Sequence, residues 1–384
     1  MKELQNENII CVSSVDWEPL WTRKQQVMSR LPASNRILYV EPPISWLSPL
    51  KDPARLEKWR TWREGIRQVN DNIFLISPPV MPPFGNIFPG INRVMQSVLA
   101  SSIIKAMEQL DMKDPILWTY LHTSAPLIGK LGEKLVVYDC VDEHSEYKGF
   151  NPQAVRAMEK ELLTKADLVF VTARGLYQDK EPFSREIHLS PNAADVDHFM
   201  QADNPLMPIA PEVRDLPSPV LGFVGAIKEW VDLDLLQFVA ESRPDCTLLM
   251  IGPVGTDVNV APLQRLPNVV FLGHQDRKYL PRFLKGFDVC LNPFRISALT
   301  STVSPLKFYE YLASGRPIAS VPMPEIMEFS DVVQFGEGRE GFLEAIEKAL
   351  DDSPDKKYRR LVRAQENSWE SRVSFMMDKI SNHL

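Results

Sequence analysis

The sequence contains no apolar run that approaches the roughly 18 residues needed for a membrane-spanning helix. Its 4 cysteines, Cys11, Cys140, Cys246 and Cys290, are far apart and lie mostly within apolar runs, so we expect buried free thiols rather than disulfides or a metal site. A basic excess is also missing, because the formal net charge is −7, and this argues against a nucleic-acid partner. The polar start of the chain does not resemble a signal peptide, and we therefore expect a cytoplasmic protein.

The glycine loop that binds dinucleotides, G-x-G-x-x-G, is absent from the first predicted β-α-β segment, whose strands are expected at residues 9–13 and 36–40. What the sequence does contain is an ordinary globular composition in 384 residues, which is long enough for two domains. Apolar strands alternate with helical segments, and this pattern predicts an α/β fold with parallel sheets covered on both faces. The proline-rich stretch 200–218 is the expected linker between the domains.

One short helix with a polar side is expected between Ser304 and Gly315. Ser304 suits the N-cap, Pro305 suits the first helical position and Gly315 suits the C-terminal stop. Lys307 and Glu310 fall on one side of this helix. Free N–H groups and a lysine at a helix start favour a diphosphate, and a carboxylate can accept hydrogen bonds from ribose hydroxyls. The alternative interpretation is a solvated helix face with a weak Lys307–Glu310 ion pair.

This segment resembles the donor-site signature of GT-B glycosyltransferases, most closely that of the glycosyltransferase 4-like (group 1) family, which includes enzymes of bacterial surface-polysaccharide and teichuronic acid biosynthesis. Further pieces of the resemblance occur in the family's order at residues 190–199, 223–226, 249–252 and 268–273. The resemblance covers nearly the whole chain. It implies two doubly wound, Rossmann-like domains that face a central cleft.

The implied domains are an acceptor-binding domain at 1–204, a nucleotide-sugar-binding domain at 217–360, and a C-terminal helix at 361–384 that packs toward the first domain. The implied activity is transfer of a sugar, with retention at the anomeric carbon, from a nucleotide-diphosphate donor to a glycan or lipid-linked acceptor in cell-envelope polysaccharide biosynthesis. Two alternatives stay open: a sugar-nucleotide 2-epimerase on the same fold, and a nucleotide-sugar-binding protein without transfer activity. The resemblance calls for no cofactor besides the donor substrate.

The family's donor-site positions correspond to a set of residues in the second domain: Gly225, Lys228, Gly252, His274, Ser304, Pro305, Leu306, Lys307 and Glu310. The family often has an arginine after the glycine of its first turn, and Ala226 occupies that place here. Lys307 is therefore expected to carry more of the diphosphate charge than Lys228. The first of the family's two signature glutamates is replaced by Thr302, which leaves open whether transfer activity is retained.

The acidic pair Asp232 and Asp234 has the D-x-D pattern of a metal site in another glycosyltransferase architecture. Both residues precede an apolar helical run, so we expect helix capping rather than metal binding. In the first domain, Asp142 and His122 each follow a predicted strand and are the candidate catalytic residues, with Asp142 as a proton acceptor or orienting group. A helix cap and a packed loop histidine are the alternative interpretations.

Residues 46–90 combine tryptophans and basic residues with an apolar, proline-broken loop at 78–90. Basic residues attract acidic lipids and aromatic rings settle at the headgroup level, so this region can contact an anionic membrane, which would be the inner face of the plasma membrane. The alternative is a surface helix and a loop that closes over an acceptor groove. Both interpretations assign the region to the acceptor side.

Overall fold

The computed structural model describes residues 4–51, 57–147 and 149–384, and the chain divides into two compact units. The first unit ends at Pro191 and also contains Arg372–Leu384, whereas the second unit is Asn192–Ser371. Each unit is built on its own parallel sheet and has its own apolar core. The α/β class and the parallel sheets expected from the sequence are therefore confirmed.

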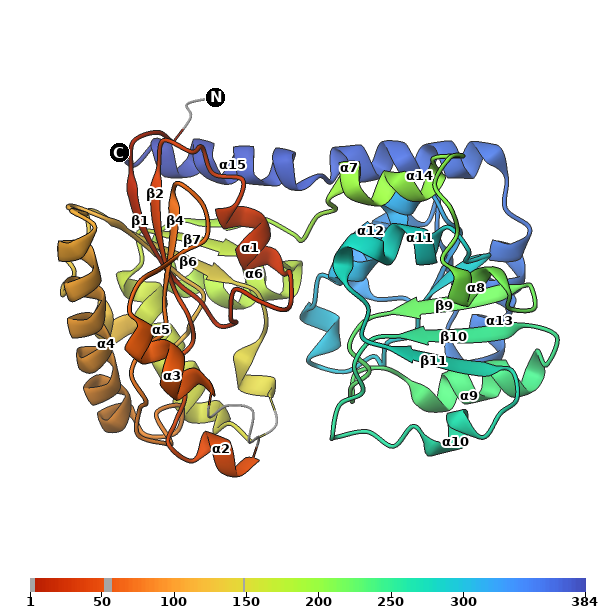
Figure 1. Cartoon of the computed structure of the whole chain (residues 1–384), viewed down its shortest axis with the longest axis horizontal. Helices are drawn as coiled ribbons and strands as arrows, with labels where there is room; N and C mark the ends of the chain where they lie inside the picture. The colour runs from red at the N-terminus through yellow and green to blue at the C-terminus, as the bar shows by residue number, and fades with distance from the viewer. Residues whose placement is uncertain (1–3, 52–56, 148) are drawn as a thin grey trace. The chain divides into compact units, whose positions relative to one another are not determined.

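The first unit contains an eight-stranded sheet in the order β3-β4-β2-β1-β5-β6-β7-β8, in which only the β3–β4 pair is antiparallel (Figure 1). Its strands are β1 (Asn8–Val12), β2 (Arg36–Val40), β3 (Arg67–Gln68), β4 (Ile73–Ile76), β5 (Ile116–Thr119), β6 (Leu135–Cys140), β7 (Leu168–Val171) and β8 (Ile187–Leu189). The central strands are buried on both faces, which is why their sequences are continuously apolar rather than alternating.

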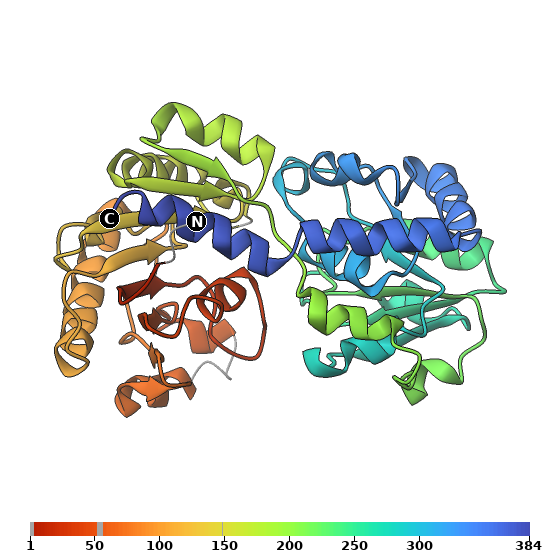
Figure 2. The ribbon, with the colours of Figure 1, turned by 90° about the horizontal axis from the view of Figure 1, so that it is seen from above.

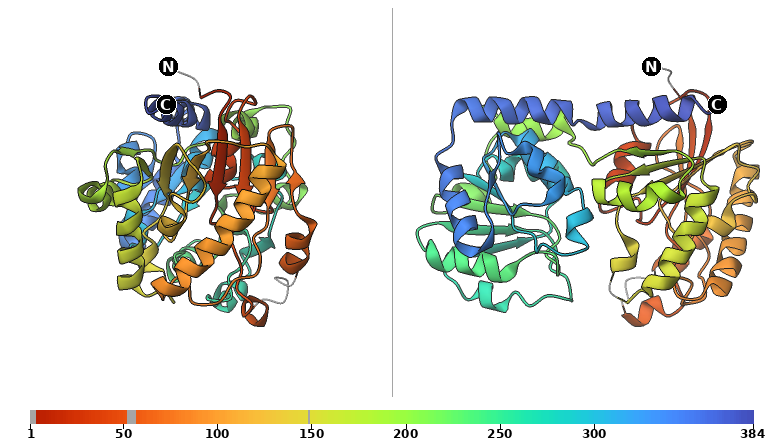
Figure 3. Two further views of the ribbon diagram at one scale, coloured as in Figure 1. Left: turned by 90° about the vertical axis from the view of Figure 1, so that its left-hand side faces the viewer. Right: turned by 180° about the vertical axis from the view of Figure 1, so that it is seen from behind.

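Helices cover both faces of this sheet. The helices of this unit are α1 (Arg23–Met28), α2 (Ser48–Lys51), α3 (Glu57–Glu64), α4 (Pro89–Gln109), α5 (Pro152–Lys165), α6 (Arg174–Lys180) and most of α15 (Trp369–Ser381). The long helix α4 lies across one face, where Leu99 and Ile103 pack in the core (Figure 3). Phe375 of α15 contacts Phe170 of β7 with the ring centroids 6.5 Å apart, so the last helix packs on this unit.

The second unit contains a six-stranded, fully parallel sheet in the order β11-β10-β9-β12-β13-β14. Its strands are β9 (Val220–Val224), β10 (Thr247–Ile251), β11 (Val269–Gly273), β12 (Val289–Asn292), β13 (Ile318–Ser320) and β14 (Gln334–Phe335). Its helices are α7 (Val196–Phe199), α8 (Pro211–Arg214), α9 (Leu233–Ser242), α10 (Ala261–Gln264), α11 (Leu280–Leu284), α12 (Leu306–Ser314), α13 (Gly338–Leu350) and α14 (Pro354–Glu366). The strand order reverses between β9 and β12, and ligands of doubly wound sheets bind at such a point.

The stretch 200–218, expected as a linker, packs on the second unit instead. Ala202, Ala210 and Val213 are buried in its core, so these apolar residues hold the segment although prolines interrupt it. The expected C-terminal helix 361–384 is likewise two helices, because α14 and α15 are separated at Asn367 and Ser368 (Figure 2).

The four cysteines are free and buried, as the sequence analysis expected. Burial raises the pKa of the Cys11 thiol well above its ordinary value. Within the described residues, no helix is long and apolar enough to cross a membrane, and no group of three or more His, Cys, Asp or Glu side chains could hold a metal ion.

Candidate functional site

The helix α12 (Leu306–Ser314) starts one residue later than expected. Its N-cap is Pro305 and its first helical residue is Leu306, so the assignment of Ser304 as N-cap is wrong. The Ser304 hydroxyl accepts a hydrogen bond from the Asn192 backbone N–H at 3.0 Å, and the Asn192 side-chain amide donates to the Ser304 carbonyl at 2.7 Å. Ser304 therefore anchors a distant segment, and no side-chain hydrogen bond caps the start of α12. The C-terminal stop is confirmed, because Gly315 has the left-handed φ of 69°.

Lys307 and Glu310 meet on one side of α12, as expected. The Lys307 ammonium donates to the Glu310 carboxylate at 2.6 Å, with side-chain exposures of 30% and 4%. The structure thus contains the i,i+3 ion pair of the alternative interpretation, but with a buried carboxylate instead of a solvated one. A cation and a carboxylate lie beside a helix start without a side-chain cap, and this arrangement can accept a phosphate and a hydroxyl-bearing group.

The turns that follow β9, β10 and β11 are joined by backbone hydrogen bonds. The N–H of Gly225 donates to the Ile251 carbonyl at 2.9 Å, and the N–H of Gly252 donates to the Gly273 carbonyl at 2.8 Å. Gly252 has a φ of 143°, and a Cβ at this position would lie 1.9 Å from the Gly225 carbonyl oxygen. Only glycine permits this approach, because any side chain would separate the two turns.

Tyr311 connects these turns to α12. Its buried hydroxyl accepts a hydrogen bond from the Val224 N–H at 2.8 Å and contacts the Val224 carbonyl at 3.3 Å. Val224 immediately precedes Gly225, so the helix bearing Lys307 and Glu310 is fixed against the end of β9. Tyr311 was not among the site residues expected from the sequence. Its pairing depends on a strand 87 positions earlier in the chain, which no local pattern reveals.

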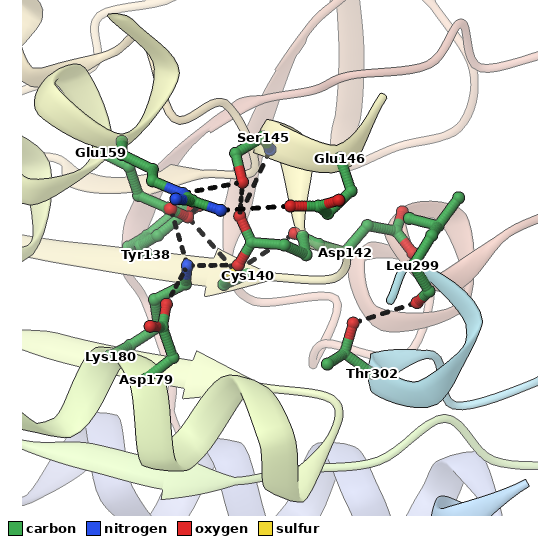
Figure 4. A network of polar contacts seen from close by, with 12 residues as sticks. Tyr138, Cys140, Asp142, Ser145, Glu146, Glu159, Asp179, Lys180, Leu299 and Thr302 are labelled. Atoms are coloured by element: carbon green, nitrogen blue, oxygen red, sulfur yellow. Dashed lines mark hydrogen bonds and ion pairs between the residues drawn. The ribbon is translucent and has the colours of Figure 1, made fainter. Parts of the chain in front are cut away.

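Lys228 and His274 are exposed at the same edge of the second sheet. The Lys228 ammonium lies 5.3 Å from the centroid of the Trp230 ring. Asp232 is the N-cap of α9 and accepts a hydrogen bond from the Leu235 N–H at 3.1 Å, which confirms its capping role. Thr302, at the position of the missing glutamate, donates its hydroxyl to the Leu299 carbonyl at 3.0 Å (Figure 4).

In the first unit, Asp142 lies in the loop after β6 and is half-buried. One of its carboxylate oxygens accepts a hydrogen bond from the Tyr147 hydroxyl at 2.9 Å. The neighbouring Glu143 caps a short helical turn through Ser145 and receives the Lys180 ammonium at 2.6 Å. These contacts fix the position of the loop that carries Asp142.

Lys180 is the centre of a buried polar network (Figure 4). Besides Glu143, it contacts Glu159 at 2.8 Å and Asp179 at 2.7 Å, and Glu159 accepts the Tyr138 hydroxyl at 2.7 Å. The carboxylates raise the pKa of Lys180 although desolvation lowers it. Lys180 and Glu159 both have hydrogen-bonded or ionic partners within this network. The network therefore supports the loop, and neither group is free to act on a substrate.

His122 follows β5 and is buried against His144, with the two ring centroids 4.7 Å apart. Desolvation, followed by the charges of His144 and Lys180, lowers the pKa of His122 to about 3, so its imidazole is neutral near pH 7. Neither ring nitrogen of His122 has a hydrogen-bond partner within the described part of the chain. His144 was not expected at the site from the sequence, because only the pairing of β5 with β6 brings it beside His122.

Asp139, by contrast, is used for structure. The buried Arg23 guanidinium donates to both of its carboxylate oxygens, at 3.0 and 2.9 Å. The same guanidinium donates to Ser190 and to the Pro191 carbonyl, so it joins β6 to the end of the first unit's main segment.

Within 46–90, large side chains are exposed at Trp46, Trp62, Phe84 and Phe88. The segments that carry Trp46 and Phe84 lie together, because the Trp46 N–H donates to the Met81 carbonyl at 3.2 Å. Arg67, a basic residue of this region, is bound to Glu41 at 2.6 Å and to Ser77 and so does not add a free charge to the surface. Residues 52–56 lie outside the described residues, as do the side chains of Lys51, Lys58 and Trp59.

Solved structures with the same fold cover nearly the whole chain. Sucrose-phosphate synthase from Thermosynechococcus elongatus is 15% identical, with a TM-score of 0.73 over 98% of both chains. HepE from Anabaena, solved in complex with UDP, is 13% identical, with a TM-score of 0.65 over 98% of this chain and 100% of its own. A trehalose-6-phosphate protein from E. coli, bound with UDP-2-fluoro glucose, is 12% identical, with a TM-score of 0.69 over 97% and 98%. These similarities establish the GT-B fold.

Residues 218–352 match the family model described as glycosyl transferases group 1. The putative teichuronic acid biosynthesis glycosyltransferase TuaH of Bacillus subtilis is 29% identical over 274 residues, which cover 66% of this chain and 68% of TuaH. The chain is therefore similar to group 1 glycosyltransferases, and the family model lies within its second unit. The resemblance inferred from the segment 304–317 is thereby confirmed, and so is the expectation of an enzyme that uses a nucleotide sugar.

Proposed function

We propose that this glycosyltransferase binds the diphosphate of its donor at the start of α12 and at the turn after β9, and that it transfers the sugar to a glycan or lipid-linked acceptor of a cell-envelope polysaccharide. The observation that carries the donor assignment is the Lys307–Glu310 pair beside a helix start with no side-chain cap. Free N–H groups, the helix dipole and a lysine together favour an anion of two phosphates.

Donor binding would exchange the partner of Lys307. The ammonium would turn from Glu310 to the diphosphate, and the freed carboxylate would accept hydrogen bonds from the ribose hydroxyls. Leu306 and Pro305 would contribute backbone groups, with Gly225, Gly252, Lys228 and His274 at the neighbouring turns. The positive helix start would then stabilise the leaving diphosphate as its charge develops. A uridine nucleotide is the first donor to test, because two proteins of this fold are described with UDP ligands.

The first unit would hold the acceptor. Asp142 would orient or deprotonate the acceptor hydroxyl, and the neutral His122 would contact a substrate as a donor or acceptor of a hydrogen bond. Retention at the anomeric carbon is part of the proposal and rests on the group 1 resemblance. A 2-epimerase would need added acid and base groups, for which the sequence offers Asp139, Asp142 and His122. The pairing of Asp139 with Arg23 counts against Asp139 in that role.

We further propose that residues 46–90 contact the anionic inner face of the plasma membrane peripherally. Trp46, Phe84 and Phe88 are each 53% exposed, and the exposed Arg60 and Arg63 of α3 add positive charge. Aromatic rings and arginines suit the interface and its acidic lipids. A membrane-bound enzyme of this kind would act on lipid-linked acceptors in the cytoplasm.

The donor assignment can be tested by thermal unfolding of the full chain with UDP-, GDP- and ADP-sugars. A ligand of the native state raises stability in proportion to the logarithm of its concentration over Kd, so the true donor should give a dose-dependent shift. Glu310→Gln should reduce that shift, and hydrolysis or transfer of the best donor would separate an enzyme from a binding protein. No shift with any nucleotide sugar would contradict the proposal.

A further inference from the structure

Four polar side chains form a continuous row in the first unit, and we refer to Lys24, Tyr120, His122 and His144 as the buried polar row. The Lys24 ammonium lies 5.3 Å from the centroid of the Tyr120 ring, and the rings of His122 and His144 are 4.7 Å apart. Lys24 lies close enough to His144 for its charge to add to the desolvation that lowers the pKa of His144. The strand register explains the row, because β1, β5 and β6 are neighbours in the sheet and Lys24 lies on the helix after β1.

The ring-bearing members of this row are buried without the partners that buried polar groups normally have. Both nitrogens of His122, Nε2 of His144 and the Tyr120 hydroxyl are buried without a partner in the described part of the chain. Lys24 is 6% exposed, and its ammonium lies over the Tyr120 ring. Buried polar groups are almost always paired, so a set of neighbouring exceptions indicates that a ligand supplies the missing contacts.

The charges in the row identify the kind of ligand. Desolvation lowers the pKa of Lys24, whereas the nearby Asp142 and Asp139 carboxylates raise it and so favour its ammonium form. Both carboxylates are already engaged, because Asp139 binds Arg23 and Asp142 accepts the Tyr147 hydroxyl. Desolvation lowers the pKa of His122 and of His144, so both imidazoles are neutral and each can donate one N–H. One ammonium and two neutral N–H donors favour an oxyanion.

We propose that Lys24, His122 and His144 bind an oxyanion, a phosphate or a carboxylate, carried by the acceptor. The acceptor is then an acidic sugar or a sugar phosphate rather than a neutral glycan. Asp142 lies beside the row and is left to orient a hydroxyl of the same acceptor. This inference rests on the proposed function for the identity of the ligand as an acceptor, but the anion site can be measured without any donor.

Two aromatic rings from the segment after β6 lie beside the imidazoles of the row. The ring of Tyr147 lies 5.8 Å from His144, and the ring of Phe150 lies 6.1 Å from His122. Both of these side chains are half-buried, and Tyr147 is joined to Asp142. Displacement of these two rings would expose the imidazoles and the lysine together. Binding of an acceptor would thus uncover the row and bring Asp142 to the hydroxyl.

The test uses three probes with the same ring and different charge: glucose 6-phosphate, glucuronate and glucose. The imidazole carbon signals in the NMR spectrum report on the site directly, because the chain has only 6 histidines. Two of these signals, assigned through His122→Asn and His144→Asn, should shift with the anionic probes and not with glucose. A preference for glucose 6-phosphate would identify a phosphate site, and a preference for glucuronate would identify a carboxylate site.

Lys24→Met should lower the affinity for the preferred anionic probe at least tenfold. Lys105→Met, at an exposed lysine of α4, should leave that affinity unchanged. UDP binding is measured on every variant, so that a folding defect or a failure of the donor assignment is seen separately. If Lys24→Met fails to fold, His144→Asn serves as the second variant and should also weaken the anion. Equal affinity for glucose and both anions, or full anion binding in the variants, would overturn the proposal.

Discussion

The two units each hold a lysine near the carboxyl ends of their strands, and the two lysines differ in how their charge is matched. Lys307 is 30% exposed and pairs with Glu310 at 2.6 Å. Lys24 is 6% exposed and lies over the face of Tyr120, and the nearby Asp142 and Asp139 carboxylates only partly offset the desolvation that lowers its pKa. A matched, partly exposed pair can exchange its partner for a ligand at little cost, whereas an unmatched buried cation destabilises the free protein. Under the proposed function, the second unit would be prepared for the donor before binding, and the first unit would gain the most stability from its ligand.

The largest effect on stability is expected at Asp139, because this buried carboxylate is paired with a buried arginine. Asp139→Asn leaves the Arg23 guanidinium, 1% exposed, without a full counter-charge and should cost about 3–5 kcal/mol of stability in the first unit. Native-state hydrogen exchange of β5 and β6 measures this loss. Asp142→Asn is the matched control, because that carboxylate is half-buried and should give a much smaller loss. Equal losses at the two positions would mean that Asp139 is not the structural carboxylate.

The second effect concerns acid stability of the first unit. The pKa of His122 is lowered to about 3, so in the folded state it stays neutral while the unfolded chain takes up a proton below about pH 6.5. Its contribution is therefore complete above that pH and is lost as the pH falls toward the folded pKa, by about 1.4 kcal/mol per pH unit. Urea unfolding of wild type and His122→Asn between these pH values should show a shallower pH dependence in the variant. An unchanged slope would place His122 in contact with solvent.

The third effect separates the phosphate contact from the rest of the donor site. Lys307→Ala should weaken a nucleoside diphosphate about tenfold to a hundredfold, since charge-assisted hydrogen bonds contribute roughly 1.5 to 3 kcal/mol. The affinity for the corresponding nucleoside should fall much less in this variant. Lys228→Ala should also lower the affinity for the diphosphate much less, because the Lys228 ammonium lies against Trp230. Calorimetric titration gives all the affinities. A larger effect at Lys228 would move the main phosphate contact to the turn after Gly225.

The smallest effect is expected at the proposed membrane surface. Arg60→Ala combined with Arg63→Ala should weaken binding to vesicles of acidic lipids by about 1 kcal/mol per arginine at low salt. Arg67→Ala is not an equivalent change, because Arg67 is held by Glu41 and Ser77. Sedimentation with anionic and neutral vesicles measures the difference. A wild-type protein that binds neither kind of vesicle would favour a loop over the acceptor groove.

The sequence predicted features that depend on local pattern. The continuous apolar strands, the Asp232 cap, the Gly315 stop and the Lys307–Glu310 pair all follow from residues within one or two turns of each other. Features set by distant segments were missed. Ser304 is taken from its expected cap by Asn192, which lies 112 positions away. The buried polar row needs three strands in one order, and spacing along the chain contains no sign of it.

The most direct test of the account is a hydrogen-exchange footprint of the full chain with a nucleoside diphosphate, beginning with UDP. The account predicts slower exchange at the start of α12, around residues 305–310, and in the turn after β9, around 225–228. It predicts little change in the buried polar row, which should respond to an acidic acceptor instead. Protection centred on the first unit, with none at the start of α12, would contradict the donor assignment on which the proposed glycosyl transfer depends.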